Sequence, residues 1–299
     1  MKYTMLKYRL IVALFCVAGL SLSGCINDFL DECYYLRVKI LNADGEEITG
    51  SIPTSLYIYD ENGKYLETKS FKADELRAYP AVKLNYPANK KLQIVSWSDS
   101  ESSSLILTRG EKIEDLLLKI ETKAGGQSVT PDQAYYGNID VTATSGGGIT
   151  RNDTIVLRPQ IGQIYIYTEG LQYALRNRSG LKSTVEPDCD YKVNNSKDAF
   201  NYKGERVGSD VYYKPETEWR SGELYAPPSS IASGDTLNVA LNLDNEVMDT
   251  RIKDVNGNYI IPPAGKQVLV IFEYGEDGAF IGVRQVIRDW GVVDDEIIL

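Results

Sequence analysis

The side chains of this sequence that could do chemistry are its cysteines and carboxylates, because the chain contains no histidine. Without histidine, Ser-His-Asp and Cys-His catalysis, histidine-ligated zinc or copper, and imidazole acid–base chemistry are all excluded. The 42 acidic residues could supply a carboxylate pair of the kind that glycosidases use, but no pair is marked out by the sequence. We therefore expect no catalytic residue, no metal ligand and no cofactor, and we expect that the protein is not an enzyme.

Cys25 is the one residue to which the sequence assigns a definite chemical role. Three basic residues within the first nine are followed by the apolar stretch from Leu10 to Leu20. This is the order of a secretory signal peptide, and the apolar stretch is too short for a stable membrane span. The segment Leu22-Ser23-Gly24-Cys25 resembles the lipobox of bacterial lipoproteins. We expect residues 1–24 to be a lipoprotein signal peptide, and Cys25 to be acylated and to begin the mature chain.

The residues around the lipidated cysteine also indicate a location. Acyl chains contribute roughly 0.8 kcal/mol per buried methylene, so a fully acylated Cys25 attaches the protein lastingly to a membrane. Cys25 is followed by Ile26 rather than by aspartate, and the acidic cluster Asp28, Asp31 and Glu32 resembles the surface-export signal of lipoproteins from the Bacteroides group. We expect the protein at the outer membrane, on its outer face, although an ordinary solvated linker would have the same composition.

The other cysteines allow at most one disulfide in the mature chain. Cys16 is removed with the signal peptide, so only Cys33 and Cys189 could form a disulfide in an oxidising compartment. The alternative is that the two remain separate thiols.

Removing the signal peptide leaves 29 basic residues against 42 acidic ones, a formal net charge of about −13. Phosphate backbones repel so acidic a chain, so we expect no nucleic-acid partner.

Alternating apolar residues predict an all-β protein. Leu56 and Ile58 alternate with Tyr57 and Tyr59, and the segment from Leu237 to Leu243 alternates in the same way. Four pairs are typical of tight hairpins that need a positive backbone φ angle, which favours antiparallel sheets: Asp44-Gly45, Asn62-Gly63, Asn256-Gly257 and Asp277-Gly278.

Two segments do not follow the strand pattern. The spacing of Ile113, Leu116, Leu117 and Ile120 predicts a short surface helix. The stretch 176–228 is polar and tyrosine-rich, so we expect long loops and short strands there.

A domain boundary is expected where one strand ends at Pro159, because proline cannot extend a β-ladder, and an alternating strand follows. The expected organisation is a lipidated linker over 25–33, an N-terminal β-sandwich over 34–159 and a C-terminal β-sandwich over 160–299.

The order of these features resembles a known family. After the lipobox come a cysteine that starts the first strand, a tyrosine-rich strand that runs into a hairpin, a strand that ends in tryptophan, a Tyr-Tyr-Gly motif, and a strand that crosses into the second half. These segments are Cys33–Val38, Leu56–Gly63, Leu92–Trp97, Tyr135–Gly137 and Thr154–Ile166. Together they resemble the fimbrial anchor and minor-subunit family of Bacteroidetes, the FimB/Mfa2-like lipoproteins.

The resemblance implies two tandem transthyretin-like β-sandwiches with antiparallel, Greek-key-like sheets, and a lipid-anchored subunit that attaches a fimbria to the cell. Its implied partners are other fimbrial subunits, above all the stem fimbrillin, which would associate by β-strand addition. The turn 42–47 lacks arginine and lysine. The first strand would therefore not be cut off by an arginine-specific protease, as happens in the family's stem subunits. The donated strand would be Phe280–Ile287 or the terminal Glu296–Leu299, unless these segments close their own domain.

A surface glycan-binding lipoprotein of a polysaccharide-uptake system is the alternative function. Trp97, Trp219, Trp290 or the pair Tyr212-Tyr213 would then be stacking platforms. Adjacent residues of a strand point to opposite faces, so the tyrosine pair could not form one platform. A coplanar pair of exposed aromatic rings in a groove would favour this alternative.

Overall fold

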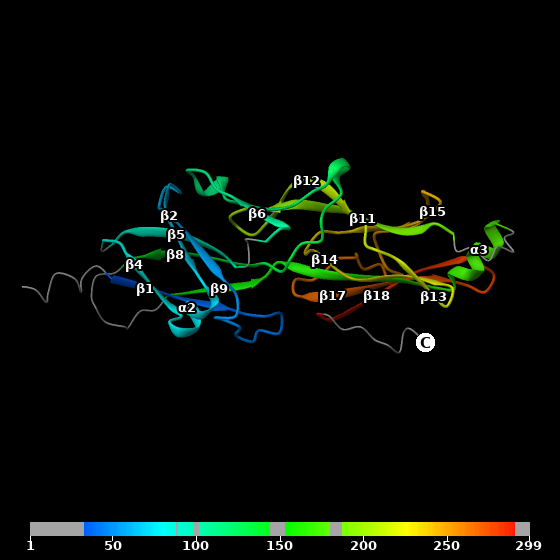
Figure 1. The fold of residues 1–299 in the computed structure, drawn as a ribbon, viewed down its shortest axis with the longest axis horizontal. Coiled ribbons are helices and arrows are strands. Elements are labelled where there is room, and N and C mark those ends of the chain that lie inside the picture. The colour runs from blue at the N-terminus through cyan, green and yellow to red at the C-terminus, as the bar shows by residue number, and fades with distance from the viewer. Residues whose placement is uncertain (1–32, 88, 99–101, 144–152, 180–186, 291–299) are drawn as a thin grey trace, which may run out of the picture.

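The computed structural model describes residues 33–87, 89–98, 102–143, 153–179 and 187–290, which form three β-sheets and two short helices. The body is elongated, with a seven-stranded sheet at one end and two facing sheets at the other (Figure 1). The prediction of a mostly β protein is confirmed. The four hairpin glycines Gly45, Gly63, Gly257 and Gly278 have φ angles of 83°, 73°, 82° and 74°, as their turn pairs predict.

The seven-stranded sheet contains most of the first half of the chain and has the order β3-β2-β5-β8-β9-β1-β4. Its halves are joined only where β8 meets β9, through two residue pairs, so the sheet folds over into two layers. Helix α2 (Ala73–Ala78) connects β3 to β4. The strands are β1 (Cys33–Ile40), β2 (Thr54–Asp60), β3 (Tyr65–Phe71), β4 (Ala81–Asn85), β5 (Lys91–Ser98), β8 (Tyr135–Thr142) and β9 (Asp153–Pro159).

The other two sheets face each other in the second half of the body. The five-stranded sheet has the order β13-β14-β10-β17-β18, and α3 (Leu171–Ser179) follows β10. Its strands are β10 (Ile161–Glu169), β13 (Glu218–Arg220), β14 (Glu223–Ala232), β17 (Lys266–Tyr274) and β18 (Phe280–Asp289). The six-stranded sheet has the path β16-β15-β11-β7-β6, with β12 paired to β11. Its strands are β6 (Leu105–Thr108), β7 (Leu117–Ile120), β11 (Cys189–Phe200), β12 (Arg206–Tyr213), β15 (Asn238–Leu243) and β16 (Glu246–Arg251).

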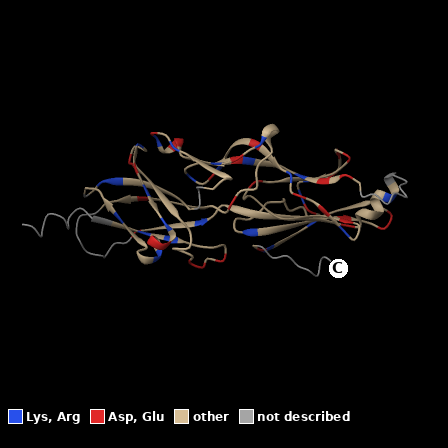
Figure 2. Cartoon of the chain, in the orientation of Figure 1, with Lys and Arg blue, Asp and Glu red and all other residues tan. Residues whose placement is uncertain are grey.

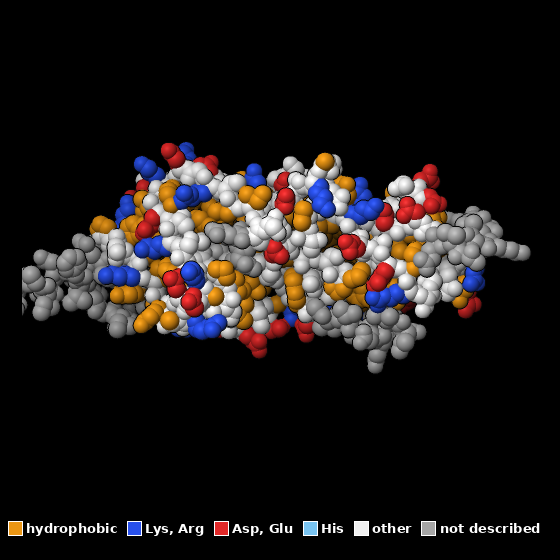
Figure 3. Space-filling model, viewed as in Figure 1, with side chains coloured by type: hydrophobic (Ala, Val, Ile, Leu, Met, Phe, Trp, Pro, Cys, Tyr) orange, Lys and Arg blue, Asp and Glu red, His pale blue; other side chains and the backbone are white. Residues whose placement is uncertain are grey.

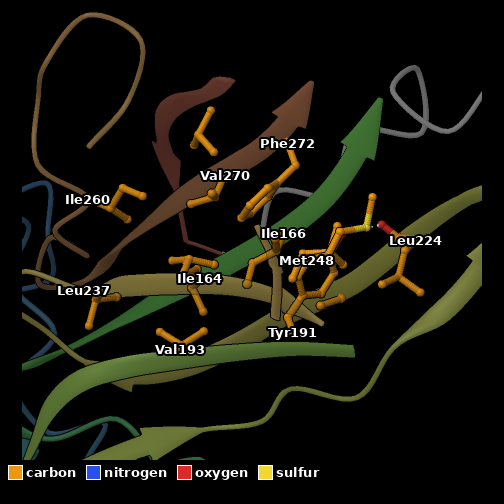
Figure 4. Close-up of a cluster of buried hydrophobic side chains, with 14 of the residues drawn as sticks. Ile164, Ile166, Tyr191, Val193, Leu224, Leu237, Met248, Ile260, Val270 and Phe272 are labelled. Carbon is orange, nitrogen blue, oxygen red and sulfur yellow. Dashed lines mark hydrogen bonds between the residues drawn. The ribbon is translucent and has the colours of Figure 1, made fainter. Parts of the chain in front are cut away.

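Each half has its own hydrophobic core. In the first half, Leu36 and Val38 of β1 pack with Leu56 and Ile58 of β2 between the two layers. In the second half, Ile166 and Phe272 of the five-stranded sheet lie opposite Tyr191 and Val193 of the six-stranded sheet (Figure 4). These are the inward positions of alternating strands, as the period-two pattern predicts.

A third cluster joins the two halves. Tyr57, Tyr59 and Trp97 lie on the outer face of β2 and β5, and the β6–β7 hairpin covers them with Leu118 and its neighbours. The same hairpin extends the six-stranded sheet, because Leu118 is the register partner of Phe200 in β11. Strand β2 is therefore buried on both faces.

A buried ion pair lies beside this third cluster. Arg206 and Asp235 approach to 2.9 Å, and their side chains are only 10% and 17% exposed. The Arg206 guanidinium also lies over the Phe200 ring at 4.7 Å and donates to the carbonyl oxygen of Ser233 at 3.2 Å. Burial lowers the pKa of Arg206, and the nearby Asp235 carboxylate opposes that shift.

The helix predicted over residues 113–120 is wrong. Ile113–Asp115 forms one 3₁₀ turn, and Leu117–Ile120 is strand β7. Leu118 and Ile120 are inward-facing positions of a strand that pairs with both β6 and β11, so tertiary pairing overrides the helical spacing. The short helices lie elsewhere, at α2 and α3.

Two further expectations differ from the structure. The polar stretch 176–228 contains the long strand β11 and the first part of β14, where inward residues such as Tyr191 and Leu224 are buried. The sheets are also not purely antiparallel, because β1 pairs with β9 and β10 pairs with β17 in parallel.

The domain boundary expected between residues 159 and 160 stays a prediction. The chain passes from the first half to the second after Pro159, but strands β6 and β7, within residues 105–120, belong to a sheet of the second half.

The contribution of the β6–β7 hairpin to stability can be measured with two substitutions. Leu118→Ala removes a fully buried side chain from the third cluster and is expected to lower the free energy of unfolding by about 2–5 kcal/mol. Ile106→Ala on the same hairpin removes a side chain that is 50% exposed and is expected to change it by less than about 0.5 kcal/mol. Urea-induced unfolding measures both, and equal effects would contradict a joint core.

Candidate anchoring and assembly site

The first described strand connects the predicted lipid to the folded body. Cys25 and the linker before residue 33 lie outside the described residues, so the lipidation site stays a prediction. Strand β1 lies inside its sheet, antiparallel to β4 on one side and parallel to β9 on the other. Its side chains Leu36, Val38 and Ile40 are fully buried. The chain that precedes β1 is therefore attached to an inner strand of the sheet, beside the edge strand β4.

The turn after β1 connects this strand to the second half of the body. The Asn42 side-chain oxygen accepts hydrogen bonds from the backbone N–H groups of Asp44 and Glu46, at 3.0 and 2.9 Å. Asp44 forms an ion pair with Lys266, and Lys266 also pairs with Asp289 at 2.8 Å. These two carboxylates raise the pKa of Lys266, Asp289 first. The turn is compact and held at its tip.

A glycine permits this close approach. A Cβ atom added to Gly265 would lie 2.7 Å from the Ala43 Cβ and 2.9 Å from the Pro159 Cγ. Gly265 also has a φ angle of +68°, which side chains rarely adopt. Sequence reasoning missed this contact, because residues 44 and 266 are far apart in the sequence and carry no shared motif.

Strand β18 contains the first candidate donor segment, Phe280–Ile287. It pairs with β17 from Lys266↔Asp289 to Tyr274↔Phe280 and is the edge strand of its sheet. On its other edge, the backbone N–H of Val255 donates to the Val283 carbonyl at 2.8 Å. The Gln285 amide donates to the Tyr259 carbonyl at 3.1 Å. This segment closes its own sheet here, and the second candidate, Glu296–Leu299, lies outside the described residues.

The structure contains Cys189 as a free, buried thiol at the start of β11 in the six-stranded sheet. Cys33 begins β1 in the seven-stranded sheet and its side chain lies outside the described part of the structure, so the disulfide considered between the two stays a prediction. Burial raises the pKa of Cys189 to about 12, with smaller contributions from the neighbouring Asp244, Asp188 and Asp190.

The aromatic residues considered as glycan platforms do not come together. Trp97 is fully buried, Tyr213 is 5% exposed, and Trp219 packs against the core of the second half. Lys192 covers the Tyr212 ring at 4.0 Å, and only Trp290, 37% exposed, faces solvent.

A groove of about 570 Å³ lies on the outer face of β5 and β8. Its single aromatic side chain is Tyr202, so the groove does not present the coplanar pair that would favour a glycan.

The described residues show no arrangement for metal or acid–base chemistry. They contain no group of three or more His, Cys, Asp or Glu side chains placed to hold a metal ion. Glu223 is the described carboxyl group whose pKa is raised, and burial is the cause. Its oxygens accept hydrogen bonds from Thr168 Oγ1 at 2.7 Å and from the backbone N–H groups of Gly170 and Leu171 at 3.0 Å. Glu223 therefore fixes the start of α3, which is a structural role.

The described surface offers no dominant charge. Lysine, arginine and acidic side chains are interspersed over both halves of the cartoon (Figure 2). On the face shown in Figure 3, apolar side chains are also mixed with charged and polar ones. No described helix has the length and apolar character needed to cross a membrane.

Comparison with known proteins shows which family has a similar sequence. Residues 30–296 match the model of a family described as the fimbrillin-A associated anchor proteins Mfa1 and Mfa2. The major fimbrium anchoring subunit FimB of Porphyromonas gingivalis is 23% identical over 303 residues, which cover 97% of each chain. These matches confirm the family resemblance that the order of the strands indicates.

Solved structures share the fold. The fimbrial anchor protein Mfa2 of Porphyromonas gingivalis superposes with a TM-score of 0.62 at 12% identity, over 86% of this chain and 96% of that one. A Bacteroides thetaiotaomicron protein that was proposed to bind polysaccharide superposes with a TM-score of 0.65 at 15% identity, over 88% and 98%. At such identities the likeness shows the fold alone.

The state of Cys189 gives a prediction for the native chain. With a pKa of about 12, a fraction of only about one in ten thousand of this thiol is ionised at pH 8. Iodoacetamide is therefore expected to alkylate Cys189 far more slowly in the folded protein than in urea, as read by peptide mass spectrometry. Equal rates in the two conditions, or a Cys33–Cys189 peptide linked by a disulfide, would contradict the free buried thiol.

Proposed function

The chain belongs to the family of fimbrillin-A associated anchor proteins, and on that premise we propose that it is a lipid-anchored outer-membrane subunit that attaches a fimbria to the cell surface. Acylated Cys25 is the membrane attachment, and the folded body is the attachment for the fimbria. The observation that carries the proposal is the position of β1, the strand that follows the tether, between two hydrogen-bonded neighbours.

The retention of β1 fits an anchor. A chain that lost this strand would lose three fully buried side chains and the pairing of both β4 and β9. It would also lose its covalent connection to the lipid. The turn after β1 contains no arginine or lysine, and its tip is held by Asn42 and by the Asp44–Lys266 ion pair. Sequence and packing both support a strand that stays in place.

The contact to the stem fimbrillin is proposed to form by β-strand addition. In such a contact, main-chain hydrogen bonds supply affinity and alternating side chains supply specificity. Since β1 fills its own sheet and β18 is paired to β17, the segment available for donation is the C-terminal one, including Glu296–Leu299. We assign no catalytic function, because the family is described as one of anchor proteins.

Lipid attachment can be tested with two cysteine substitutions. Cys25→Ala is expected to move the protein from the membrane fraction to the medium or the periplasm, because no acyl chain can be added. Fimbriae are then expected in the culture supernatant rather than on cells. Cys16→Ala, within the signal peptide, is the matched control and is expected to leave both properties unchanged. Cell fractionation and electron microscopy measure them.

Deletion of the whole gene gives the stronger test of the function. Fimbriae that keep their normal length and stay on cells without this protein would refute the anchor assignment. Membrane retention of the Cys25→Ala protein would refute only the lipid attachment, so the two parts of the proposal can fail separately.

Strand addition predicts a role for the end of the chain. Removal of Glu296–Leu299 is expected to reduce co-purification of the stem fimbrillin strongly, because three apolar side chains of the donated strand are lost. The substitution Glu296→Gln keeps those side chains and serves as the control. Unchanged co-purification after the deletion would place the contact elsewhere on the body.

A further inference from the structure

One face of the first half of the body has an excess of basic residues. It is the outer face of the layer formed by β4, β1 and β9, which we call the basic face. The inward residues of these strands, such as Leu36, Val82 and Ile155, are buried in the core of the first half. The alternate residues therefore point away from that core. They are Tyr35, Arg37 and Lys39 of β1, Ala81, Lys83 and Asn85 of β4, and Thr154, Val156 and Arg158 of β9.

The charged residues among these outward positions all have the same sign. Arg37, Lys39, Lys83 and Arg158 are basic, and none of the outward residues just named is acidic. The Arg37 and Lys39 side chains are 48% and 37% exposed, and both lie near one carboxylate, that of Glu47, at 3.7 and 3.5 Å. One carboxylate shared by two cations leaves a positive surplus. Basic and acidic side chains are mixed over the described body as a whole, so this face is a local exception (Figure 2).

The register of the strands brings the basic residues into one continuous patch. Tyr35 and Lys83 are partners in the antiparallel β1–β4 pair, and Arg37 and Thr154 are partners in the parallel β1–β9 pair. Partner residues point to the same face of a sheet, and neighbouring strands lie about 4.8 Å apart. The cations of the three strands therefore lie within a width of about 10 Å.

Two exposed tyrosines belong to the same surface. Tyr35 is 41% exposed and Tyr79 is 78% exposed. The backbone N–H of Val38 donates to the Pro80 carbonyl at 2.8 Å, which continues the β1–β4 ladder and brings Tyr79 opposite Lys39. Tyrosine is enriched where proteins meet lipid headgroups, because its ring is apolar and its hydroxyl is polar. Basic residues combined with exposed aromatic ones are typical of a contact with an anionic membrane surface.

We propose that the basic face binds the phosphate-bearing headgroups of the membrane that holds the lipid of the same chain. The inference rests on the proposed lipidation of Cys25. Cys33, the first residue of β1, follows Cys25 closely in the sequence. Even a fully extended linker of this length spans only about 26 Å at about 3.3 Å per residue. The lipid therefore keeps the basic face near the bilayer, and a tethered face has a high effective concentration, so a weak contact is enough.

The contact sets the orientation of the body. A flexible tether alone leaves the body free to rotate, whereas a bound basic face holds β4, β1 and β9 against the headgroups. The β6–β7 hairpin covers the other layer of the first half, over β2 and β5, and so faces away from the membrane (Figure 1). The junction between the two halves is then turned towards the surroundings of the cell.

The test measures how the mature chain carrying Cys25→Ser, which has no lipid of its own, binds to vesicles. Sedimentation compares vesicles of phosphatidylcholine with vesicles in which about one third of the lipid is phosphatidylglycerol. At about 0.1 M salt the Debye length is about 10 Å, so the basic face is attracted while the distant acidic residues of the body are screened. We expect binding to the anionic vesicles only, and weaker binding as salt is added.

Two double variants locate the contact. A basic side chain at an anionic surface strengthens binding about fivefold, so Arg37→Gln with Arg158→Gln is expected to bind about 25-fold more weakly. Lys91→Gln with Lys119→Gln is the matched control, because it removes the same charge from exposed positions of β5 and β7. The control is expected to bind as the parent chain does. Urea-induced unfolding verifies that both double variants are folded.

A tryptophan reports the depth of the contact. Tyr79→Trp is expected to be quenched by vesicles whose acyl chains carry bromine, because Tyr79 lies on the basic face. Lys119→Trp, on the hairpin over the other layer, is expected to show no quenching beyond that of the native tryptophans. Equal quenching at the two positions would contradict the proposed orientation.

Three results would overturn the inference. The first is absence of binding to anionic vesicles, and the second is equal weakening in the two double variants. The third is binding that appears only after Asp28→Asn, Asp31→Asn and Glu32→Gln, which would mean that the acidic linker competes with lipid for the basic face. None of these results bears on the lipid attachment or on fimbrial anchoring, because Cys25→Ala and gene deletion test those separately.

Discussion

The rest of the structure depends on the burial of an apolar surface on both faces of β2 and β5. Leu56 and Ile58 face the layer that contains β1, while Tyr57 and Trp97 face away from it. Left uncovered, the second face would be a large exposed apolar patch. The β6–β7 hairpin covers it and also extends the sheet built on β11, so that this third cluster joins the two halves. The Arg206–Asp235 ion pair and the Asp44–Lys266 contact lie along the same junction.

The sequence predicts strands and turns well, but it does not predict which strands and sheets pack together. Alternation sorts Leu56 and Ile58 from Tyr57 and Tyr59, and the Asn-Gly and Asp-Gly pairs mark turns whose glycines have positive φ angles. Alternation cannot tell whether the second face of a strand meets solvent or another sheet. For the same reason, Leu118 and Ile120 fit a helical stripe as well as a strand until their partners on β11 are known. Parallel pairing of β1 with β9 is a long-range choice that leaves no local signal.

In the candidate site, too, the sequence predicts local features but not the contacts between residues that are distant in sequence. The lipobox before Cys25 is a local signal that can be read directly, and the absence of histidine excludes much of enzyme chemistry without any structure. The position of β1 inside its sheet and the ion pair from its turn to Lys266 depend on residues distant in sequence. Alternation in Ile164–Tyr167 predicts a strand, but only the structure places the rings of Tyr165 and Tyr167 beside Tyr225 and Leu269. Family membership then connects these features to fimbrial anchoring.

The direction in which β1 runs has a mechanical consequence. The strand enters at the end of the elongated body and runs towards its middle, with a neighbour on each side (Figure 1). Tension between a fixed N-terminus and a load at the far end of the molecule would act along the strand axis. Its ladder bonds would then be sheared together instead of being peeled apart one after another, and shearing many bonds at once requires much greater force. A body loaded through its first strand in this way would resist unfolding under tension, even though each hydrogen bond in the ladder is weak.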